Sequence, residues 1–159
     1  YYICKIPEGE VIKMNSDLII SKLKDILSKR DEIMFAYLFG SLSKGKETEL
    51  SDVDVAIYVD ENKKPPSSIF GYKADMISEL EKNLDYDIDL VILNDASLLL
   101  SFNIIKNGEL IFCNSEKEKV NFHFETQRDY LDFKPVLEEQ NNRLNNWVNS
   151  ENSEEENKW

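Results

Sequence analysis

The feature that most constrains the fold is a pair of short apolar runs separated by a polar, glycine-containing turn. The first run spans 33–39 and ends at Gly40, and the second spans 52–59. In the second run, valine and isoleucine alternate with residues that include Asp52 and Asp54. This period of two is typical of a strand with one buried face. We therefore predict that the two segments are neighbouring β-strands.

Asp52 and Asp54 are candidate metal ligands. Residues two apart in a strand point to the same side, so both carboxylates are expected on one face. Magnesium prefers oxygen ligands and usually keeps waters and substrate phosphates in its shell. The pair indicates metal-assisted chemistry on a nucleotide.

The turn ahead of these acids has the residues that a phosphate-handling loop needs. Gly40 lets the backbone approach a phosphate closely, and Ser41 offers a hydroxyl and an amide. Lys44 or Lys46 could pair with a β- or γ-phosphate, although both are equally well explained as solvated turn residues. The turn and the acids would address opposite parts of one ligand.

The rest of the chain alternates helical and extended patterns. Apolar positions three and four apart predict helices, and alternation predicts further strands. The predicted elements are a helix from Asn15 or Ser16 to about Arg30, strands over 33–39 and 52–59, a helix after the loop 60–68 that includes Ile69 and Phe70, a strand over 87–93, a helix opened by 95–97 and closed by 107–108, a strand over 109–113, and a helix from about 115 to about 137 that continues or restarts toward 147. This order predicts an α+β (mixed α/β) fold, a small mixed β-sheet flanked by helices on one side.

The length of 159 residues fits one domain. We predict a single domain over 1–148 with a C-terminal helix, and an acidic, flexible tail over 149–159. The chain begins with Tyr1 in place of methionine, which suggests a trimmed N-terminus.

Charge and composition exclude several classes of protein. The formal charge of -12 argues against an extended nucleic-acid surface. No apolar run approaches the roughly 18 residues of a membrane span, so we expect a cytoplasmic protein without membrane contact. Cys4 and Cys113 have no metal-ligand spacing and indicate neither a disulfide framework nor a zinc cluster.

A third carboxylate is expected from the strand over 87–93. Asp87 and Asp89 share one face of it. If this strand lies beside Asp52 and Asp54, about 4.8 Å away, one of the two acids falls within metal reach. Geometry alone leaves Asp87 and Asp89 open and predicts a three-carboxylate, two-metal site.

The residues now assembled resemble a known family. Gly40-Ser41, a gap of ten, Asp52-Val53-Asp54, and Asp89 in the later run 88–91 resemble the nucleotidyltransferase motif of the DNA polymerase β superfamily. The motif is most similar to the small bacterial MNT, or minimal nucleotidyltransferase, branch, as is the segment 128–135. The resemblance implies a polymerase β-like nucleotidyltransferase fold and selects Asp89 over Asp87.

The resemblance also implies roles for these residues. Gly40 and Ser41 would bind the triphosphate of ATP, and Asp52 and Asp54 would hold magnesium, with two ions in the site. Asp89 would complete the site as a ligand and as a base. Family members often carry arginine soon after the Gly-Ser pair, whereas this chain has Leu42 and Lys44.

The partner implied by the resemblance is a HEPN ribonuclease toxin, with this chain as the antitoxin. Some MNT proteins neutralise such a toxin by transferring AMP from ATP to a toxin tyrosine. Antibiotic-modifying relatives add a helical domain that builds a drug pocket, whereas only 70 residues follow Asp89 here. Two alternatives remain: transfer to a small molecule such as an aminoglycoside-type antibiotic, and a non-catalytic antitoxin that acts by binding.

The final predicted helix also carries aromatic residues and the single histidine. His123 has no acid or cysteine at a telling spacing, so no chemistry is assigned to it. We interpret the aromatics as core or interface residues and not as a platform for a nucleobase. They are Phe122, Phe124, Tyr130 and Phe133.

Overall fold

The computed structural model describes the backbone over 8–40 and 52–156, and the side chains over 17–40, 52–140 and 142–143. The elements are α1 (Glu8–Leu27), β1 (Ile33–Phe39), β2 (Val53–Val59), η2 (Glu61–Lys63), α2 (Tyr72–Leu84), β3 (Ile88–Ile92), η3 (Leu93–Asp95), α3 (Leu98–Asn107), β4 (Glu109–Cys113) and α4 (Glu116–Glu156). The predicted order of helices and strands is confirmed. No helix in the described ranges combines the length and apolarity needed to cross a membrane.

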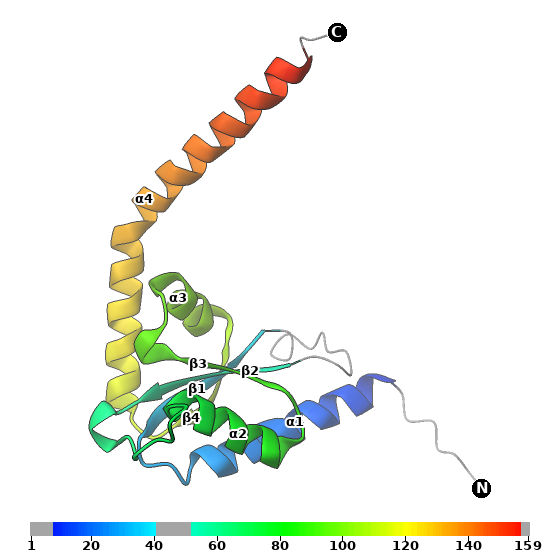
Figure 1. The fold of residues 1–159 in the computed structure, drawn as a ribbon, viewed down its shortest axis with the longest axis vertical. Helices are drawn as coiled ribbons and strands as arrows, with labels where there is room; N and C mark the ends of the chain where they lie inside the picture. The colour runs from blue at the N-terminus through cyan, green and yellow to red at the C-terminus, as the bar shows by residue number, and fades with distance from the viewer. Residues whose placement is uncertain (1–7, 41–51, 157–159) are drawn as a thin grey trace, which may run out of the picture.

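The four strands form one mixed sheet in the order β3-β2-β1-β4 (Figure 1). β1 pairs antiparallel with both β2 and β4, and β2 pairs parallel with β3. The parallel pair is connected through α2, which crosses over the sheet between β2 and β3. The prediction of a small mixed sheet is confirmed.

Helices cover both faces of this sheet, so the prediction of helices on one side is wrong. One face packs against α1 and α2 and holds the larger core, which includes Leu23, Val55 and Met76. The other face packs against α3 and the start of α4, and its core includes Phe35, Ala56 and Ile104. The reason is visible in β1, whose residues are buried almost without interruption, as expected for a strand covered on both faces.

A β-bulge at Met34 links β1 to the start of α4. Ile33 pairs with Val59, whereas Phe35 pairs with the adjacent Tyr58, so Met34 is the extra residue of the bulge. The Met34 carbonyl accepts hydrogen bonds from the backbone amides of residues 114 and 115, at 2.7 and 3.1 Å. The bulge therefore anchors the short connection that leads from β4 into α4.

Two helix starts differ from prediction. α1 begins at Glu8, before the predicted cap, because residues 10–14 contain neither glycine nor proline and continue the helix. α2 begins after Ile69 and Phe70, which stay in the preceding loop. Gly71 has a φ of +87°, outside helical geometry, so the helix cannot extend back through it.

α4 is the longest element and packs on the body over only part of its length. Its 41 residues correspond to about 60 Å of helix. Phe122 packs against Phe35, and Tyr130 stacks on Phe102 of α3 with ring centroids 3.6 Å apart. Phe124 is exposed, so the aromatics of this helix divide between core and surface.

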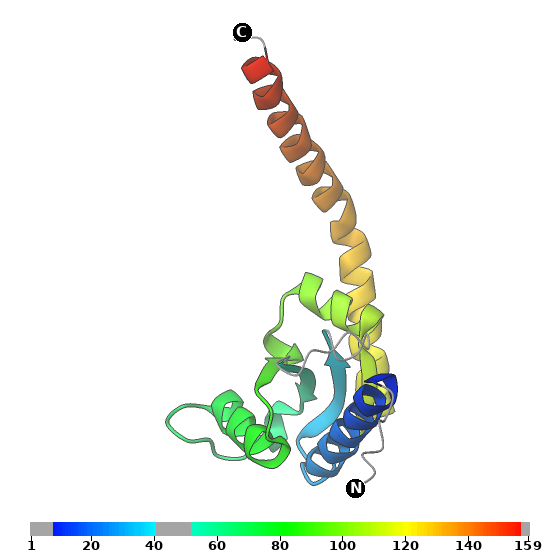
Figure 2. The same ribbon diagram turned by 90° about the vertical axis from the view of Figure 1, so that its right-hand side faces the viewer.

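The second half of α4 projects away from the body (Figures 1 and 2). The helix bends where its colour passes from yellow to orange, and Pro135 lies inside it. Proline removes an amide donor and kinks a helix without ending it here. The backbone is helical as far as Glu156, beyond the predicted end near 147, and the division at residue 148 remains a prediction.

Candidate functional site

The parallel pairing of β2 and β3 places two of the predicted acids side by side. Asp54 of β2 is the register partner of Asp89 of β3. Asp87 precedes β3, and its backbone carbonyl accepts a 2.9 Å hydrogen bond from the amide of Val53, the first residue of β2. Asp54 is half-buried and Asp89 is exposed. The condition set for a third acid, that the strand of Asp87 and Asp89 lies beside that of Asp54, is met.

The surroundings of Asp54 shift the pKa of its carboxyl. Burial raises the pKa of its carboxyl, and the nearby carboxylates of Asp89 and Asp52 raise it further. Asp52 lies just before β2 and is exposed. Asp54 therefore feels both its strand neighbour Asp89 and its sequence neighbour Asp52.

Gly40, the first residue after β1, lies against Asp54. Its φ is +76°, in the left-handed region that favours glycine. A Cβ atom at this position would stand 1.9 Å from Oδ2 and 2.7 Å from Cγ of Asp54. The side chain of Asp54 therefore occupies space that any residue other than glycine at position 40 would fill.

The end of α3 closes this side of the sheet. The Gly108 amide caps the helix by donating to the Ile104 carbonyl at 2.7 Å. A Cβ atom on Gly108 would lie 2.6 Å from the same oxygen and 3.2 Å from the Leu38 carbonyl. The end of α3 therefore sits against the end of β1, next to Gly40.

The predicted phosphate ligands other than Gly40 are not part of the described structure. Ser41, Lys44 and Lys46 lie in the segment 41–51, outside the described residues. Their roles remain predictions.

The ligand types at these acids fit magnesium. In the described ranges, no three acidic, histidine or cysteine side chains are grouped so that they could hold a metal ion by themselves. Asp52, Asp54 and Asp89 nevertheless offer only oxygen donors, and their repulsion at Asp54 is of the kind that a divalent cation relieves. Waters and nucleotide phosphates are the ligands that magnesium takes in addition to one or two carboxylates.

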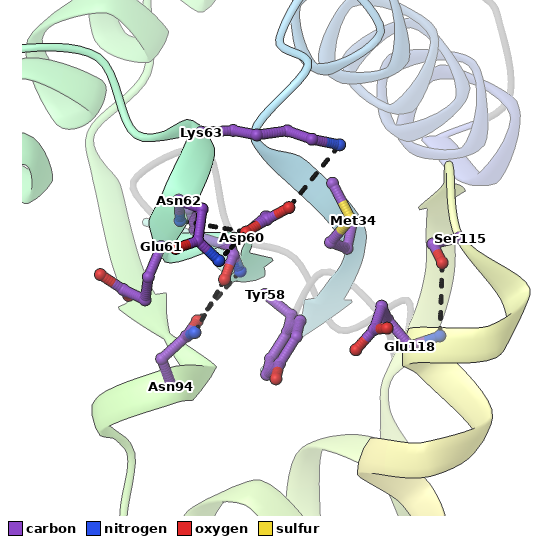
Figure 3. A pocket seen from close by; sticks show the side chains of 10 residues that line it. Met34, Tyr58, Asp60, Glu61, Asn62, Lys63, Asn94, Ser115 and Glu118 are labelled. Atoms are coloured by element: carbon purple, nitrogen blue, oxygen red, sulfur yellow. Dashed lines mark hydrogen bonds and ion pairs between the residues drawn. The ribbon is translucent and has the colours of Figure 1, made fainter.

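A cavity of about 510 Å³ lies at the other end of β2 (Figure 3). Its walls come from residues 58–63 together with Met34, Asn94, Ser115 and Glu118. Asn94 fixes the strand end by exchanging two hydrogen bonds with the Val59 backbone, at 2.9 and 2.8 Å. The four residues from Asp54 to Tyr58 correspond to about 13 Å of strand, so the cavity is separate from the acids.

His123 has a partner that the sequence did not reveal. The Tyr37 hydroxyl of β1 and Nε2 of His123 on α4 are 2.6 Å apart. Burial, with smaller effects from Cys113 and Glu116, raises the pKa of Tyr37 to about 12. Burial and Lys119 lower the pKa of His123, which Glu116 partly opposes. The hydrogen bond between Tyr37 and His123 helps to hold α4 on the sheet.

Together these features define a small α+β domain with three acids at the N-terminal ends of the parallel strands β2 and β3, beside Gly40. This arrangement is expected of a metal-dependent domain that handles nucleotides. A family model described as "Polymerase beta, Nucleotidyltransferase" matches residues 21–117. The chain belongs to the polymerase beta nucleotidyltransferase family.

Curated relatives share this sequence region. A candidate protein adenylyltransferase of Methanocaldococcus jannaschii is 37% identical over 73 residues, which cover 46% of this chain and 70% of the relative. The protein adenylyltransferase MntA of Shewanella oneidensis is 27% identical over 108 residues, which cover 68% of this chain and 72% of the relative.

Solved structures share the fold. A toxin-antitoxin structure with AMP-PNP has a TM-score of 0.57 at 22% identity, and the match covers 76% of this chain and 96% of the other. The structure of a tri-AMPylated Shewanella oneidensis HEPN toxin in complex with MNT antitoxin has a TM-score of 0.52 at 23% identity, with coverages of 80% and 97%. The predicted nucleotidyltransferase fold is confirmed.

Proposed function

We propose that this chain is an antitoxin that transfers AMP from ATP to a tyrosine hydroxyl of a partner HEPN-family ribonuclease toxin. The observation that carries this proposal is the pairing of Asp54 with Asp89 beside Gly40. It supplies the acid set of a nucleotidyltransferase in a chain whose relatives are named as protein adenylyltransferases.

The proposed reaction is a single displacement at the α-phosphorus. The tyrosine oxygen forms a bond to the α-phosphorus of ATP, the bond from that phosphorus to the bridging oxygen breaks, and pyrophosphate leaves. Asp89 is exposed and is proposed to accept the hydroxyl proton. The product is a tyrosine that carries AMP through a phosphodiester bond.

The other residues hold the nucleotide. Asp52 and Asp54, with Asp89, are proposed to bind two magnesium ions, which when bound neutralise charge on the phosphates. Gly40 and Ser41 are proposed to bind the β- and γ-phosphates, with Lys44 as a further contact. The raised pKa of Asp54 supports the metal assignment. Its carboxylate is repelled by Asp89 and Asp52, and a bound cation would relieve that repulsion.

The test is intact mass spectrometry of a candidate HEPN-family toxin, co-expressed with this chain and then incubated with this protein, ATP and magnesium. We expect mass increments of one AMP or its multiples on the partner. The Asp52→Asn, Asp54→Asn double variant should give none. Asp87→Asn is the matched control: it removes a carboxylate two residues from Asp89, and transfer should persist.

The result also separates the alternatives. An unmodified partner that nevertheless binds both the native protein and the double variant would replace transfer with neutralisation by binding. An unmodified partner together with turnover of an aminoglycoside-type antibiotic would point to a small-molecule acceptor. Either result overturns the proposal of protein adenylylation.

A further inference from the structure

α4 has a second face that the body of the protein leaves uncovered. Three large apolar side chains, Val120, Phe124 and Leu131, are 58%, 65% and 64% exposed. Their spacings of four and seven residues place them on one side of a helix with 3.6 residues per turn. Thr126, on the opposite side, is buried against the body. We call the three exposed residues the apolar stripe.

An acidic margin accompanies this stripe. By helical geometry, Glu125, Asp132 and Glu139 lie to one side of it. Lys117, Arg128 and Arg143 occur on the same side, and the two arginines are paired within the helix. Arg128 binds Asp129 at 2.7 Å and Arg143 binds Glu139 at 2.5 Å. The sequence of α4 carries eleven acidic and five basic residues, so the helix has a negative net charge.

Charge selects among the possible occupants of the stripe. A second copy of this chain would bring two acidic helices together in a protein whose formal charge is already -12. An anionic membrane surface attracts basic segments and repels acidic ones. A protein that binds RNA must be basic where it meets the phosphates. The stripe and its margin are complementary to such a protein.

The position of α4 relative to the acids agrees with a docking role. Residues alternate between the two faces of β2, and Ala56 belongs to the core under α3 and α4. Asp54, two residues earlier, shares that face. α4 rises from the same side of the sheet and continues beyond the body (Figure 1). A protein held along α4 would therefore lie on the side that presents Asp54.

We infer that the apolar stripe and its acidic margin form the docking surface for the basic, RNA-binding face of the HEPN-family partner. This inference rests on the proposed function for the identity of the partner. Docking in this way would cover the toxin's RNA-binding surface and bring its acceptor hydroxyl to the acid site. Binding and transfer are thereby assigned to different parts of the chain.

The test compares two double variants that remove equally exposed apolar side chains. Phe124→Ser, Leu131→Ser alters the stripe. Ile69→Ser, Phe70→Ser is the matched control in the loop before α2, where the side chains are 94% and 78% exposed. Neither variant removes a buried side chain, so both should fold; circular dichroism and thermal unfolding verify this. The probe is the same candidate HEPN-family toxin, purified.

Affinity is measured by calorimetry without ATP, so that the result does not depend on transfer. We expect the stripe variant to bind about 30-fold or more weakly, as for loss of interface anchor residues, and the control to bind like the native protein. We also expect the affinity of the native protein to fall as salt is raised, and Glu125→Gln, Asp132→Gln to reduce that dependence.

Two outcomes would overturn the inference. One is native affinity in the stripe variant. The other is a dimer of the native chain alone, seen by sedimentation velocity, that the stripe variant dissolves. Stripe-dependent binding without AMP transfer would instead uphold the docking surface and reject the proposed function, so the two failures are distinguishable.

Discussion

Gly40 and Asp54 are in such close contact that a single added Cβ atom on residue 40 would stand 1.9 Å from the Asp54 carboxylate. The contact joins the end of β1 to the start of β2, whose residues Phe39 and Asp54 are register partners. The glycine therefore serves the acid as well as the turn, because the carboxylate can hold its place only while position 40 lacks a side chain.

The first prediction concerns Gly40→Ala. We expect transfer to fall about 100-fold, because displacing a catalytic group by about 1 Å costs that much. Magnesium binding, followed by calorimetry with a non-hydrolysable ATP analogue, should weaken in parallel.

Gly71→Ala is the matched control for that change. Gly71 also has a positive φ, +87°, but nothing lies within 4 Å of its would-be Cβ. Both variants should lose about 1–3 kcal/mol of stability from a positive φ that side chains disfavour, and only Gly40→Ala should lose activity. Equal activity in the two variants would contradict the proposed role of the contact.

The second prediction separates Asp89 from Asp87. Asp89 is the register partner of Asp54 in the pairing of β2 with β3. Asp87 contributes its backbone carbonyl, which accepts a hydrogen bond from Val53. We expect Asp89→Asn to reduce the rate of transfer by about 100-fold or more and Asp87→Asn to change it less than about threefold. Single-turnover kinetics at saturating magnesium provide the measurement. The reverse order would exchange their roles.

The third prediction is a stability difference at Asp54. Its folded-state pKa is raised, so the folded protein binds a proton there more tightly than the unfolded chain does. The tighter proton binding stabilises the folded protein at low pH, and this stabilisation is lost as the pH rises through the raised pKa. We therefore expect Asp54→Asn to raise the melting temperature at pH 7 without divalent ions.

The gain from Asp54→Asn should shrink as the pH falls through the raised pKa of Asp54, because the native carboxyl is then protonated. Magnesium should raise the melting temperature of the native protein more than that of the variant, because a ligand stabilises the state that binds it. A variant that melts below the native protein at pH 7 would show that the carboxylate is not under repulsion.

The fourth prediction concerns the Tyr37–His123 hydrogen bond. Burial is the main cause of the lowered pKa of His123; Lys119 lowers it and Glu116 raises it. Stability from neutral His123 is fully present above the unfolded pKa of about 6.5 and is lost as pH falls through the lower folded pKa. Urea unfolding at pH 7.5 and 5.5 should show this loss in the native protein.

His123→Gln keeps a hydrogen-bonding side chain that does not titrate, and should remove part of this pH dependence. Tyr37→Phe should cost about 1 kcal/mol at pH 7.5, because the partly buried His123 nitrogen loses its hydrogen-bonding partner. An unchanged pH slope in His123→Gln would assign the acid sensitivity to other groups.

Much of the fold could be predicted because local signals agree with tertiary structure. The apolar run 33–39 is bounded by Gly40 and became β1 with the expected limits. Ser97 caps α3 and Gly108 ends it, as the sequence indicates. The strand with Asp87 and Asp89 was recognisable from its alternation, whereas its pairing beside β2 was only a condition that the structure meets.

What could not be predicted depends on contacts between distant residues. Tyr37 and His123 are 86 positions apart, so no spacing announces their hydrogen bond. Ile69 and Phe70 have the apolar character of a helix face, but the backbone of Gly71 separates them from α2. The fit of Gly40 against Asp54 depends on the approach of two strand ends, which only the folded chain sets.

The parallel pairing of β2 and β3 has a consequence for the order in which the protein gains its properties. Asp54 and Asp89 come together only after the intervening α2 crossover has closed, and long-range parallel pairing of this kind is a slow event in folding. A chain still emerging from the ribosome would carry Asp54 before its neighbour exists. The complete set of three acids is therefore a property of the finished molecule, because a chain that ends before β3 has Asp54 without Asp89.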